Sequence, residues 1–478
     1  MRRDPRYPII EEIDIKGFPL DVFELFRKER FSFFLDSGMD PQKQGRYSFI
    51  GGDPFLVLSS RGSEITLTRD DEKECLNDNP FDILNYFLEL YRLDSCPSPV
   101  PFTGGAVGYL SYDLCHFIER LPGTAMDDLK LPECYLGFYD LAVAFDNLQD
   151  KAYIISTGFP ELREGQRIDR ARQRLNEVRD RLAHLPLNAT DAPVMSVSSP
   201  EKQMTLKGSF THQEYVEAVE KARQYIINGD IFEVNLSQRF EAEMAITPYE
   251  LYRRLRQINP APFAAYLGFD EVTVVGASPE RFLRLQGDMV ETRPIKGTRP
   301  RGKTPGEDEA LANELLGSAK DKAENIMIVD LERNDLGRVC RYGTIKVTEL
   351  AVLEVFPTVF HLTSTVVGKL REGLNCADLL KATFPGGSIT GAPKVRAMEI
   401  IDEQEPTRRS VYTGSIGYLG FNGDIDLNIT IRTFLVKGNR AYFQAGGAVV
   451  YDSNPEAEYQ ETLDKARALI DALNMPSS

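Results

Sequence analysis

SIGYLGFNGDIDLNITIR, residues 415–432, is the stretch that decides the fold class. Its first part, 415–421, is mostly apolar, and the Asn-Gly-Asp that follows at 422–424 is typical of a tight hairpin turn. After the turn, polar and apolar residues alternate from 426 to 432, which is the period of a β-strand. The stretch therefore predicts two antiparallel strands joined directly by a turn.

Helices are predicted on either side of strands in the rest of the C-terminal half. Thr211 and Glu214 have the spacing of a capping box, and the helical pattern that they begin ends at Gly229. An alternating strand follows at 232–237, and a last helix begins at Pro455. Strands in hairpins, separated by helices, indicate an α+β protein whose antiparallel sheets are covered by helices.

One shift in composition suggests how the chain is divided. Residues 184–207 are rich in Pro, Ser and Thr and have no apolar period. We therefore predict an N-terminal region at 10–183, a connector at 184–208 and a C-terminal region at 209–474. A long surface loop within a single domain is the alternative.

The charge and the cysteines exclude several classes of protein. Lys and Arg number 56 against 72 Asp and Glu, a net charge of −16, so the chain is a poor general binder of nucleic acid or of an anionic membrane. No apolar run approaches the roughly 20 residues of a membrane helix, and no secretion signal is apparent. Six cysteines without a C-x-x-C pair predict a reduced, cytoplasmic protein.

Two pairs of carboxylates predict a site for a hard cation. Glu458 and Glu461 are three residues apart on the last helix, with Lys465 on the same stripe, and Asp321 and Glu324 have the same spacing where another helix begins. Carboxylate oxygens suit Mg²⁺ before Ca²⁺. The alternative is a solvated helix face that carries a Glu–Lys pair.

A basic run at 293–303 contains five cations, among them Arg293, Lys296 and Arg299. It reads either as a basic surface loop or as a loop that handles a small anion, since the net charge and the lack of aromatic residues disfavour nucleic acid. A lysine crowded by other cations has a lowered pKa, so Lys296 is a candidate nucleophile.

Two glycine-rich stretches are candidate ligand contacts. The stretch 384–394 leads into a helix and offers free backbone N–H groups to an anion, although it lacks the order of a nucleotide-binding P-loop. Glycines inside the strand at 444–448 mark a bulge or a close ligand. Taken alone, a histidine on a strand such as His361 is more often structural than functional, and Glu280 at a strand end is only a turn residue.

Together, these motifs resemble those of the chorismate-utilising enzymes. The matching stretches occur in the order 229–239, 277–282, 294–302, 330–337, 386–394 and 459–462, and the N-terminal part resembles the family at 34–37 and 45–49. The lysine at position 296 resembles the residue that component I of the aminodeoxychorismate synthases carries in this motif, whereas anthranilate synthase large chains carry alanine there. The resemblance implies two orthogonally packed, largely antiparallel sheets with helices on the outside.

The resemblance also implies a reaction and its residues. Lys296 adds to C2 of chorismate as the C4 hydroxyl leaves with a proton from Glu280, and ammonia then attacks C4 and expels the lysine, which gives 4-amino-4-deoxychorismate for p-aminobenzoate and folate. Mg²⁺ is held directly by Glu324 and Glu461 and through water by Asp321 and Glu458. The implied contacts to chorismate are His361, Thr390, Gly391, Tyr418, Arg432, Gly446, Gly447 and Lys465.

The chain has no Gly-x-Cys-x-Gly motif of a glutaminase, so we expect ammonia from a separate glutamine amidotransferase subunit, component II. A tryptophan site near Ser37 is implied as well, although Asp36 stands where tryptophan-regulated relatives carry glutamate. Ala448 and Asp321 are further departures, from a glycine and a glutamate. The alternatives are anthranilate synthase component I and a non-catalytic ligand sensor on the same fold.

Overall fold

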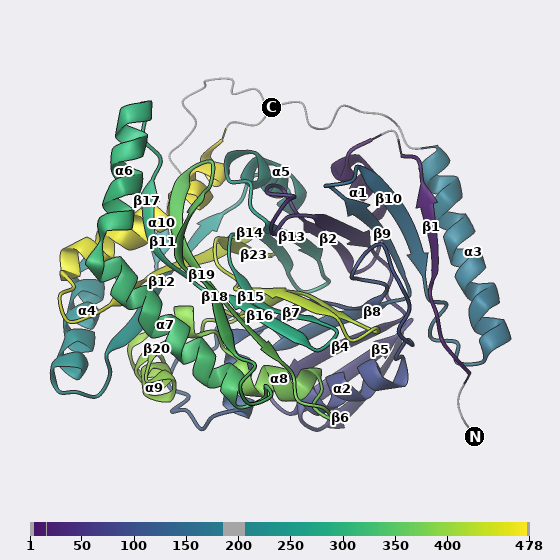
Figure 1. The fold of residues 1–478 in the computed structure, drawn as a ribbon, viewed down its shortest axis with the longest axis horizontal. Coiled ribbons are helices and arrows are strands. Elements are labelled where there is room, and N and C mark those ends of the chain that lie inside the picture. Colours follow the sequence, from purple (N-terminus) through teal and green to yellow (C-terminus); the bar gives the residue numbers. More distant parts are fainter. Residues whose placement is uncertain (1–3, 16, 185–205, 476–478) are drawn as a thin grey trace.

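The structure is a computed structural model that describes residues 4–15, 17–184 and 206–475. Most of the predicted connector at 184–208 lies outside the described residues, so its role remains a prediction. Two antiparallel sheets and ten α-helices make up the described part (Figure 1).

The first sheet has 12 strands, and its neighbouring strands are antiparallel. In spatial order it contains β1 (Ile9–Ile13), β10 (Lys151–Ser156), β9 (Leu141–Asp146), β3 (Tyr47–Gly51), β2 (Ser32–Asp36), β13 (Phe263–Gly268), β14 (Thr273–Ser278), β23 (Thr433–Lys437), β24 (Arg440–Val449), β12 (Glu233–Glu243) and β11 (Lys207–Gly208), with β20 (Gly391–Ala392) also paired to β12.

The second sheet also has 12 strands in antiparallel pairs. Its spatial order is β17 (Ile295–Pro300), β19 (Val359–Lys369), β16 (Met289–Arg293), β15 (Arg281–Gln286), β22 (Ile425–Asn428), β21 (Ser415–Gly420), β7 (Gly105–Leu110), β8 (Cys134–Tyr139), β4 (Leu56–Arg61), β5 (Glu64–Arg69) and β6 (Glu72–Asn77), with β18 (Lys346–Val355) paired to β19.

The helices lie outside this pair of sheets (Figure 1). They are α1 (Pro19–Phe26), α2 (Pro80–Leu90), α3 (Glu164–Ala183), α4 (His212–Ile227), α5 (Pro248–Ile258), α6 (Pro305–Gly317), α7 (Ala319–Gly337), α8 (Cys376–Thr383), α9 (Lys394–Gln404) and α10 (Pro455–Asn474), with short 3-10 helices η1 (Tyr112–Phe117) and η2 (Gly387–Ile389). Among the described residues, no helix is both long enough and apolar enough to span a membrane.

Three large hydrophobic clusters hold the layers together. One is rich in aromatic rings, takes residues from both sheets, such as Phe49 and Tyr109, and fills the space between them. A second joins the first sheet to α1, α3, α5 and α10, and a third joins the second sheet to α2, α8 and α9. The prediction of two largely antiparallel sheets with helices outside is therefore confirmed.

The predicted N-terminal and C-terminal regions share both sheets. Strand β2 pairs with β13 in the first sheet, and β7 pairs with β21 in the second. Neither region therefore forms a sheet that is complete without the other.

The locally predicted elements are largely present. The hairpin at 415–432 forms as β21 and β22, and Thr211 caps α4 with the expected capping box. β22 ends at Asn428 rather than at Arg432, however. The N–H of Ile429 donates to the carbonyl of Glu280, and Arg432 has a φ of +52°, so the chain leaves the strand conformation before it reaches the predicted end.

Candidate active site

A cavity of about 870 Å³ is lined by residues of β12, β17, β19, β24, α7 and α10. This volume suits a metabolite-sized ligand. The structure brings most of the predicted site residues to its wall: Glu280, Lys296, Asp321, Glu324, His361, Arg432, Gly446, Glu458, Glu461 and Lys465.

Lys296 lies in the cavity wall on β17 and is only 8% exposed. Its Nζ donates a hydrogen bond to Oε1 of Glu233, a fully buried residue on β12. Burial lowers the pKa of Lys296, but the carboxylates of Glu233, Glu324 and Glu280 together raise this pKa more, so the net shift is upward. The expectation of a pKa lowered by neighbouring cations is therefore wrong.

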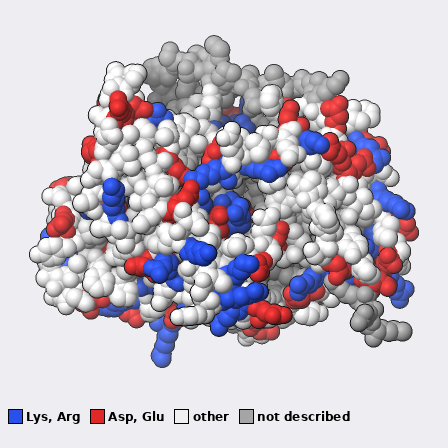
Figure 2. Space-filling view, in the orientation of Figure 1, with Lys and Arg blue, Asp and Glu red and all other residues white. Residues whose placement is uncertain are grey.

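The arginines of the basic run do not act on Lys296 as expected because each is paired with carboxylates. The pairs are Arg293 with Glu349 (3.0 Å) and Glu354 (2.6 Å), Arg299 with Glu314 (2.7 Å) and Asp321 (3.2 Å), and Arg301 with Asp308 (2.6 Å). Figure 2 shows basic and acidic side chains interspersed over one face of the molecule. The run 293–303 is therefore not a continuous positive surface.

Glu280 is a buried carboxyl group in the short connection between β14 and β15. Its Oε1 accepts hydrogen bonds from the hydroxyl of Ser388 (2.6 Å) and from the N–H of Ile295 (3.2 Å). Burial raises the pKa of Glu280 to about 7, and the two hydrogen bonds limit that rise. A carboxyl group that is about half protonated at neutral pH suits a general acid.

The four predicted metal ligands face the cavity from two helices, Asp321 and Glu324 from α7 and Glu458 and Glu461 from α10. Burial raises the pKa of Glu324 to about 7, and burial also raises the pKa of Glu458. Oε1 of Glu458 accepts a hydrogen bond from Ser453 (2.6 Å), while its Oε2 is buried without a partner. A buried carboxylate oxygen without a donor is the kind of atom that a cation satisfies.

The carboxylates are not gathered at ligand distance in this arrangement. Glu461 forms an ion pair with Lys465 (2.7 Å), and Asp321 pairs with Arg299. In the part of the chain that the structure describes, no group of three or more His, Cys, Asp or Glu side chains is placed to hold a metal ion. The residue types fit Mg²⁺, but the lysine and arginine partners must move before the carboxylates converge.

Cations and a neutral histidine complete the wall. The guanidinium of Arg432 has no hydrogen bond or ion pair with the described residues, and burial lowers its pKa. Nδ1 of His361 lies 2.9 Å from the hydroxyl of Thr298. Burial, together with Arg432 and Lys465, lowers the pKa of His361 to about 3, so its ring is neutral at pH 7. The guanidinium of Arg432 can form charge-assisted hydrogen bonds with an anionic group of a ligand, and the neutral ring of His361 beside it suits an uncharged ring of the same ligand.

Three predicted substrate contacts, Thr390, Gly391 and Gly447, are not among the residues that line the cavity. The hydroxyl of Thr390 donates to the carbonyl of Gly386 (3.0 Å), so it stabilises its own loop. Gly391 has a φ of +141°, and a Cβ there would lie 2.2 Å from the carbonyl oxygen of Glu233. Their contact with substrate remains a prediction.

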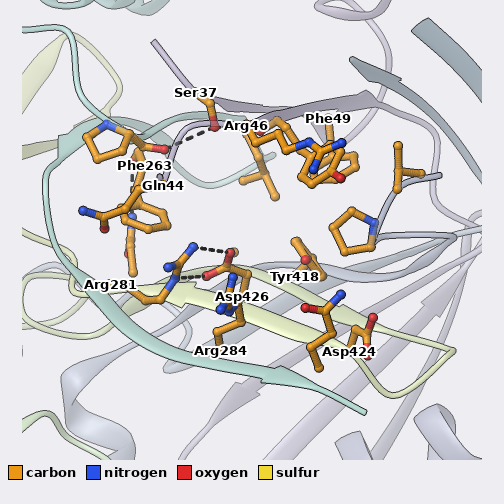
Figure 3. Close-up of a pocket in the computed structure, with 18 of the residues that line it drawn as sticks. Ser37, Gln44, Arg46, Phe49, Phe263, Arg281, Arg284, Tyr418, Asp424 and Asp426 are labelled. Atoms are coloured by element: carbon orange, nitrogen blue, oxygen red, sulfur yellow. Dashed lines mark hydrogen bonds and ion pairs between the residues drawn. The ribbon is translucent and has the colours of Figure 1, made fainter. Parts of the chain in front are cut away.

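A second cavity of about 500 Å³ lies near Ser37 (Figure 3). The hydroxyl of Ser37 donates to the carbonyls of Tyr47 (2.6 Å) and Pro262 (3.3 Å). Across the cavity, Arg281 donates two hydrogen bonds to the carboxylate of Asp426 (2.9 and 3.0 Å).

Tyr418 requires a correction, because the structure places it in the wall of this second cavity and not of the first. Its ring lies 4.9 Å from that of Phe102 and 5.5 Å from that of Phe49, within the core between the sheets. Alternate residues of a strand point to opposite faces, and the face of β21 that carries Tyr418 is the one that packs in this core.

Two residues that the sequence patterns did not indicate, Glu233 and Ser388, contact the two central side chains of the first cavity, Lys296 and Glu280. Glu233 reads as the polar member of an alternating strand, and such residues usually face solvent. Asn235 and Ser237 on the same side of β12 are buried too, since Asn235 lines the cavity and Ser237 donates hydrogen bonds to Glu405 (2.8 and 2.9 Å). One sequence pattern could have indicated Glu233. The polar residues of its strand, β12, belong to a family motif, and the glycine-rich strand that pairs with β12 is β24.

Comparison with known proteins agrees with this geometry. The family model described as chorismate binding enzyme matches residues 38–471. Anthranilate synthase component 1 of Acetivibrio thermocellus is 40% identical over 460 residues, which cover 95% of this chain and 92% of that protein. Aminodeoxychorismate synthase component 1 of Bacillus subtilis (strain 168) is 40% identical over 456 residues, which cover 95% and 94%.

A solved structure has the same fold. The crystal structure of anthranilate synthase component I from Streptococcus pneumoniae TIGR4 has a TM-score of 0.78 and 34% identity, and the match covers 90% of this chain and 94% of that one. The family match spans well over half of the sequence and includes all the residues of the first cavity. The chain therefore belongs to the chorismate-binding enzyme family.

Proposed function

We propose that the protein aminates chorismate at C4 and releases 4-amino-4-deoxychorismate, the precursor of p-aminobenzoate and folate. The observation that carries this proposal is the amine of Lys296 in the wall of a cavity that also contains Glu280, the four carboxylates of the predicted metal site, and Arg432, whose side chain has no partner among the described residues. A buried lysine is unnecessary for binding alone, which disfavours the non-catalytic sensor.

Lys296 and Glu280 have complementary roles in this reaction. The lysine amine attacks C2 of chorismate and the C4 hydroxyl departs. Glu280, whose pKa burial raises to about 7, supplies the proton that makes the hydroxyl leave as water. Ammonia then attacks C4 and the lysine leaves from C2.

Charge on the substrate is offset by the cavity wall. Chorismate carries two carboxylates, and Arg432 and Lys465 are the cations that we assign to them. Glu324 and Glu461 would hold Mg²⁺ directly, with Asp321 and Glu458 acting through water. The bound ion would neutralise a substrate carboxylate and so favour binding.

Anthranilate synthase is the second candidate, since relatives with that name are as similar as those named aminodeoxychorismate synthase. It differs by amination at C2 and release of pyruvate. We favour the 4-amino product because a lysine at position 296 supplies a covalent nucleophile that blocks C2.

Incubation of the pure protein with chorismate, Mg²⁺ and ammonium, followed by mass spectrometry and absorbance of the products, tests the proposal. We expect a non-aromatic 4-amino product that retains pyruvate. Lys296→Ala should lose most of this product while it still binds chorismate. Anthranilate from the unaltered protein, or unchanged 4-amination by Lys296→Ala, would refute the proposal.

We further propose that ammonia comes from a glutamine amidotransferase, component II, which the component 1 names of the relatives support. Ammonium salts but not glutamine should then sustain the isolated chain. We also propose a cytoplasmic location, which six cysteines without a disulfide support.

The cavity near Ser37 is our proposed tryptophan site. Its wall contains charged side chains such as Arg281 and Asp426, which suit the charged groups of an amino acid, and aromatic rings such as Phe49, which suit an aromatic side chain. The side chain of Asp36 accepts hydrogen bonds from Tyr252 and Arg256 (each 2.7 Å), which tie it to α5. The chain has no tryptophan, so equilibrium dialysis read by tryptophan fluorescence has no protein background, and no retained tryptophan would refute the site.

A further inference from the structure

The pair formed by Lys296 and Glu233 poses a problem for the proposed chemistry. An ammonium group has no lone pair, and at the ordinary pKa of about 10.4 only about one lysine in 10³ is neutral at pH 7. Here the environment holds the amine in its charged form more firmly still, because Glu233 lies against it. A nucleophilic Lys296 therefore needs an acceptor for its proton.

Glu233 meets the geometric requirements of that acceptor. Its Oε1 is hydrogen-bonded to Nζ of Lys296, and the residue does not line the cavity, so it contacts the amine from behind the wall. Substrate can thus enter in front of Lys296 without displacing Glu233. Glu233 pairs with Ala392 of β20, and this pairing holds in place the end of β12 that carries the Glu233 side chain.

The second carboxylate oxygen of Glu233 is evidence that the pair with Lys296 is catalytic and not merely structural. A buried structural carboxylate normally accepts hydrogen bonds on both oxygens, but Oε2 of Glu233 is buried without a partner. Oε2 therefore leaves one acceptor position of this carboxylate open beside the amine. Proton transfer from Lys296 also replaces a buried ion pair with two neutral groups.

Two other carboxylates face Lys296, and neither is as well placed. Glu280 from the end of β14 and Glu324 from α7 both act on the charge of Lys296, and Lys320 acts on that of Glu324. Within the described part of the chain neither carboxylate hydrogen-bonds Nζ, which donates to the carboxylate of Glu233.

We propose that Glu233 is a catalytic residue, the base that removes a proton from the Lys296 ammonium and returns it at the end of the cycle. This inference rests on the proposed function, in which Lys296 is the nucleophile.

The step balances as follows. The proton moves from Nζ to Oε1 of Glu233, and the freed lone pair forms the bond from Nζ to C2. The double bonds shift from C1=C2 and C5=C6 to C1=C6 and C4=C5, the C4–O bond breaks, and Glu280 gives its proton to the hydroxyl. Ammonia then attacks C4, the double bonds shift back, and Lys296 leaves as an amine that regains the proton from Glu233. The ammonium of the product supplies the proton that restores Glu280.

The test is the rate at which the covalent adduct on Lys296 forms without ammonia, followed by rapid quenching and intact mass between pH 6 and 7. In this window titration of Glu280, whose pKa is about 7, lowers the rate by no more than about twofold. Internal transfer therefore predicts a rate that does not rise with pH in the unaltered protein. In Glu233→Gln the proton must pass to water, so the rate should fall at least tenfold at pH 6 and recover about tenfold per pH unit.

Two variants serve as controls. Glu233→Asp restores a carboxylate and should regain a rate independent of pH. Glu241 lies on the same strand and pairs with Lys207 (3.1 Å). Glu241→Gln should therefore leave the pH profile of adduct formation unchanged.

The outcomes separate the inference from the function on which it rests. An adduct in the unaltered protein together with an unchanged profile in Glu233→Gln would overturn the role of Glu233 alone. A tenfold rise per pH unit in the unaltered protein would overturn it as well, even if Glu233→Gln failed to fold. No adduct and no 4-amino product from the unaltered protein would instead refute the proposed function.

Discussion

Glu280 links a buried side chain to a pH dependence that can be measured. Because burial raises its pKa to about 7, the carboxyl group is mostly protonated below pH 7 and mostly ionised above it. A general acid acts in its protonated form, so turnover should fall about tenfold per pH unit above pH 7. A pH–rate profile with ammonium in excess checks this, and a flat profile from pH 7 to 9 would contradict it. Glu280→Gln, which has no proton to give, should lose at least about 10²-fold in rate.

A substitution of the single residue Glu461 tests the proposed magnesium site. Glu461→Gln keeps the shape of the side chain but removes an anionic oxygen that a hard cation prefers. We expect the Mg²⁺ concentration for half-maximal activity to rise about tenfold or more, and chelation with EDTA to abolish the activity of both proteins. Glu456→Gln is the matched control, because Glu456 is exposed on α10 and pairs with His212 (2.7 Å) outside the cavity. An equal response of the two variants would argue against the site.

At the scale of elements, β20 shows how a short strand supports the site. Gly391 pairs with Val234, and a Cβ at Gly391 would meet both the carbonyl oxygen of Glu233 and the side chain of Ala397 (2.9 Å). Gly391→Ala should therefore cost about 1–3 kcal/mol or more in the free energy of unfolding and lower activity by shifting β12. Gly229 also has a positive φ, of +84°, but open space around it, so Gly229→Ala should cost less. Denaturant unfolding of both variants measures the difference, and equal losses would mean that the contact with β12 is unimportant.

Patterns within one element were predicted well from the sequence, and contacts between elements were not. The Asn-Gly-Asp turn, the cap at Thr211 and the carboxylate pairs on α7 and α10 depend on residues a few positions apart, and each is present. Glu233 and Lys296 are 63 residues apart, and their contact depends on how two different sheets are placed. Tyr418 was assigned to the substrate from the family resemblance, and no pattern in this sequence shows which of the two faces of β21 is covered by the core.

Across the whole molecule, the division into regions at 10–183 and 209–474 does not follow the packing. Both sheets run through the two regions, and the aromatic core between the sheets takes side chains from each, for example Phe33 and Leu267. The first cavity is built from C-terminal residues, yet the sheets that carry it extend into strands of the N-terminal region.

The described part of the chain should therefore unfold as one cooperative unit. Leu267 on β13 is fully buried in the core shared by both sheets, so Leu267→Ala should cost about 2–5 kcal/mol. Since β13 joins β2 of one region to β14 of the other, this loss should lower the whole thermal transition and not a part of it. Differential scanning calorimetry should show one transition in both proteins, with equal calorimetric and van't Hoff enthalpies. Two resolved transitions, of which Leu267→Ala lowered only one, would show instead that the two regions are energetically independent in spite of their shared sheets.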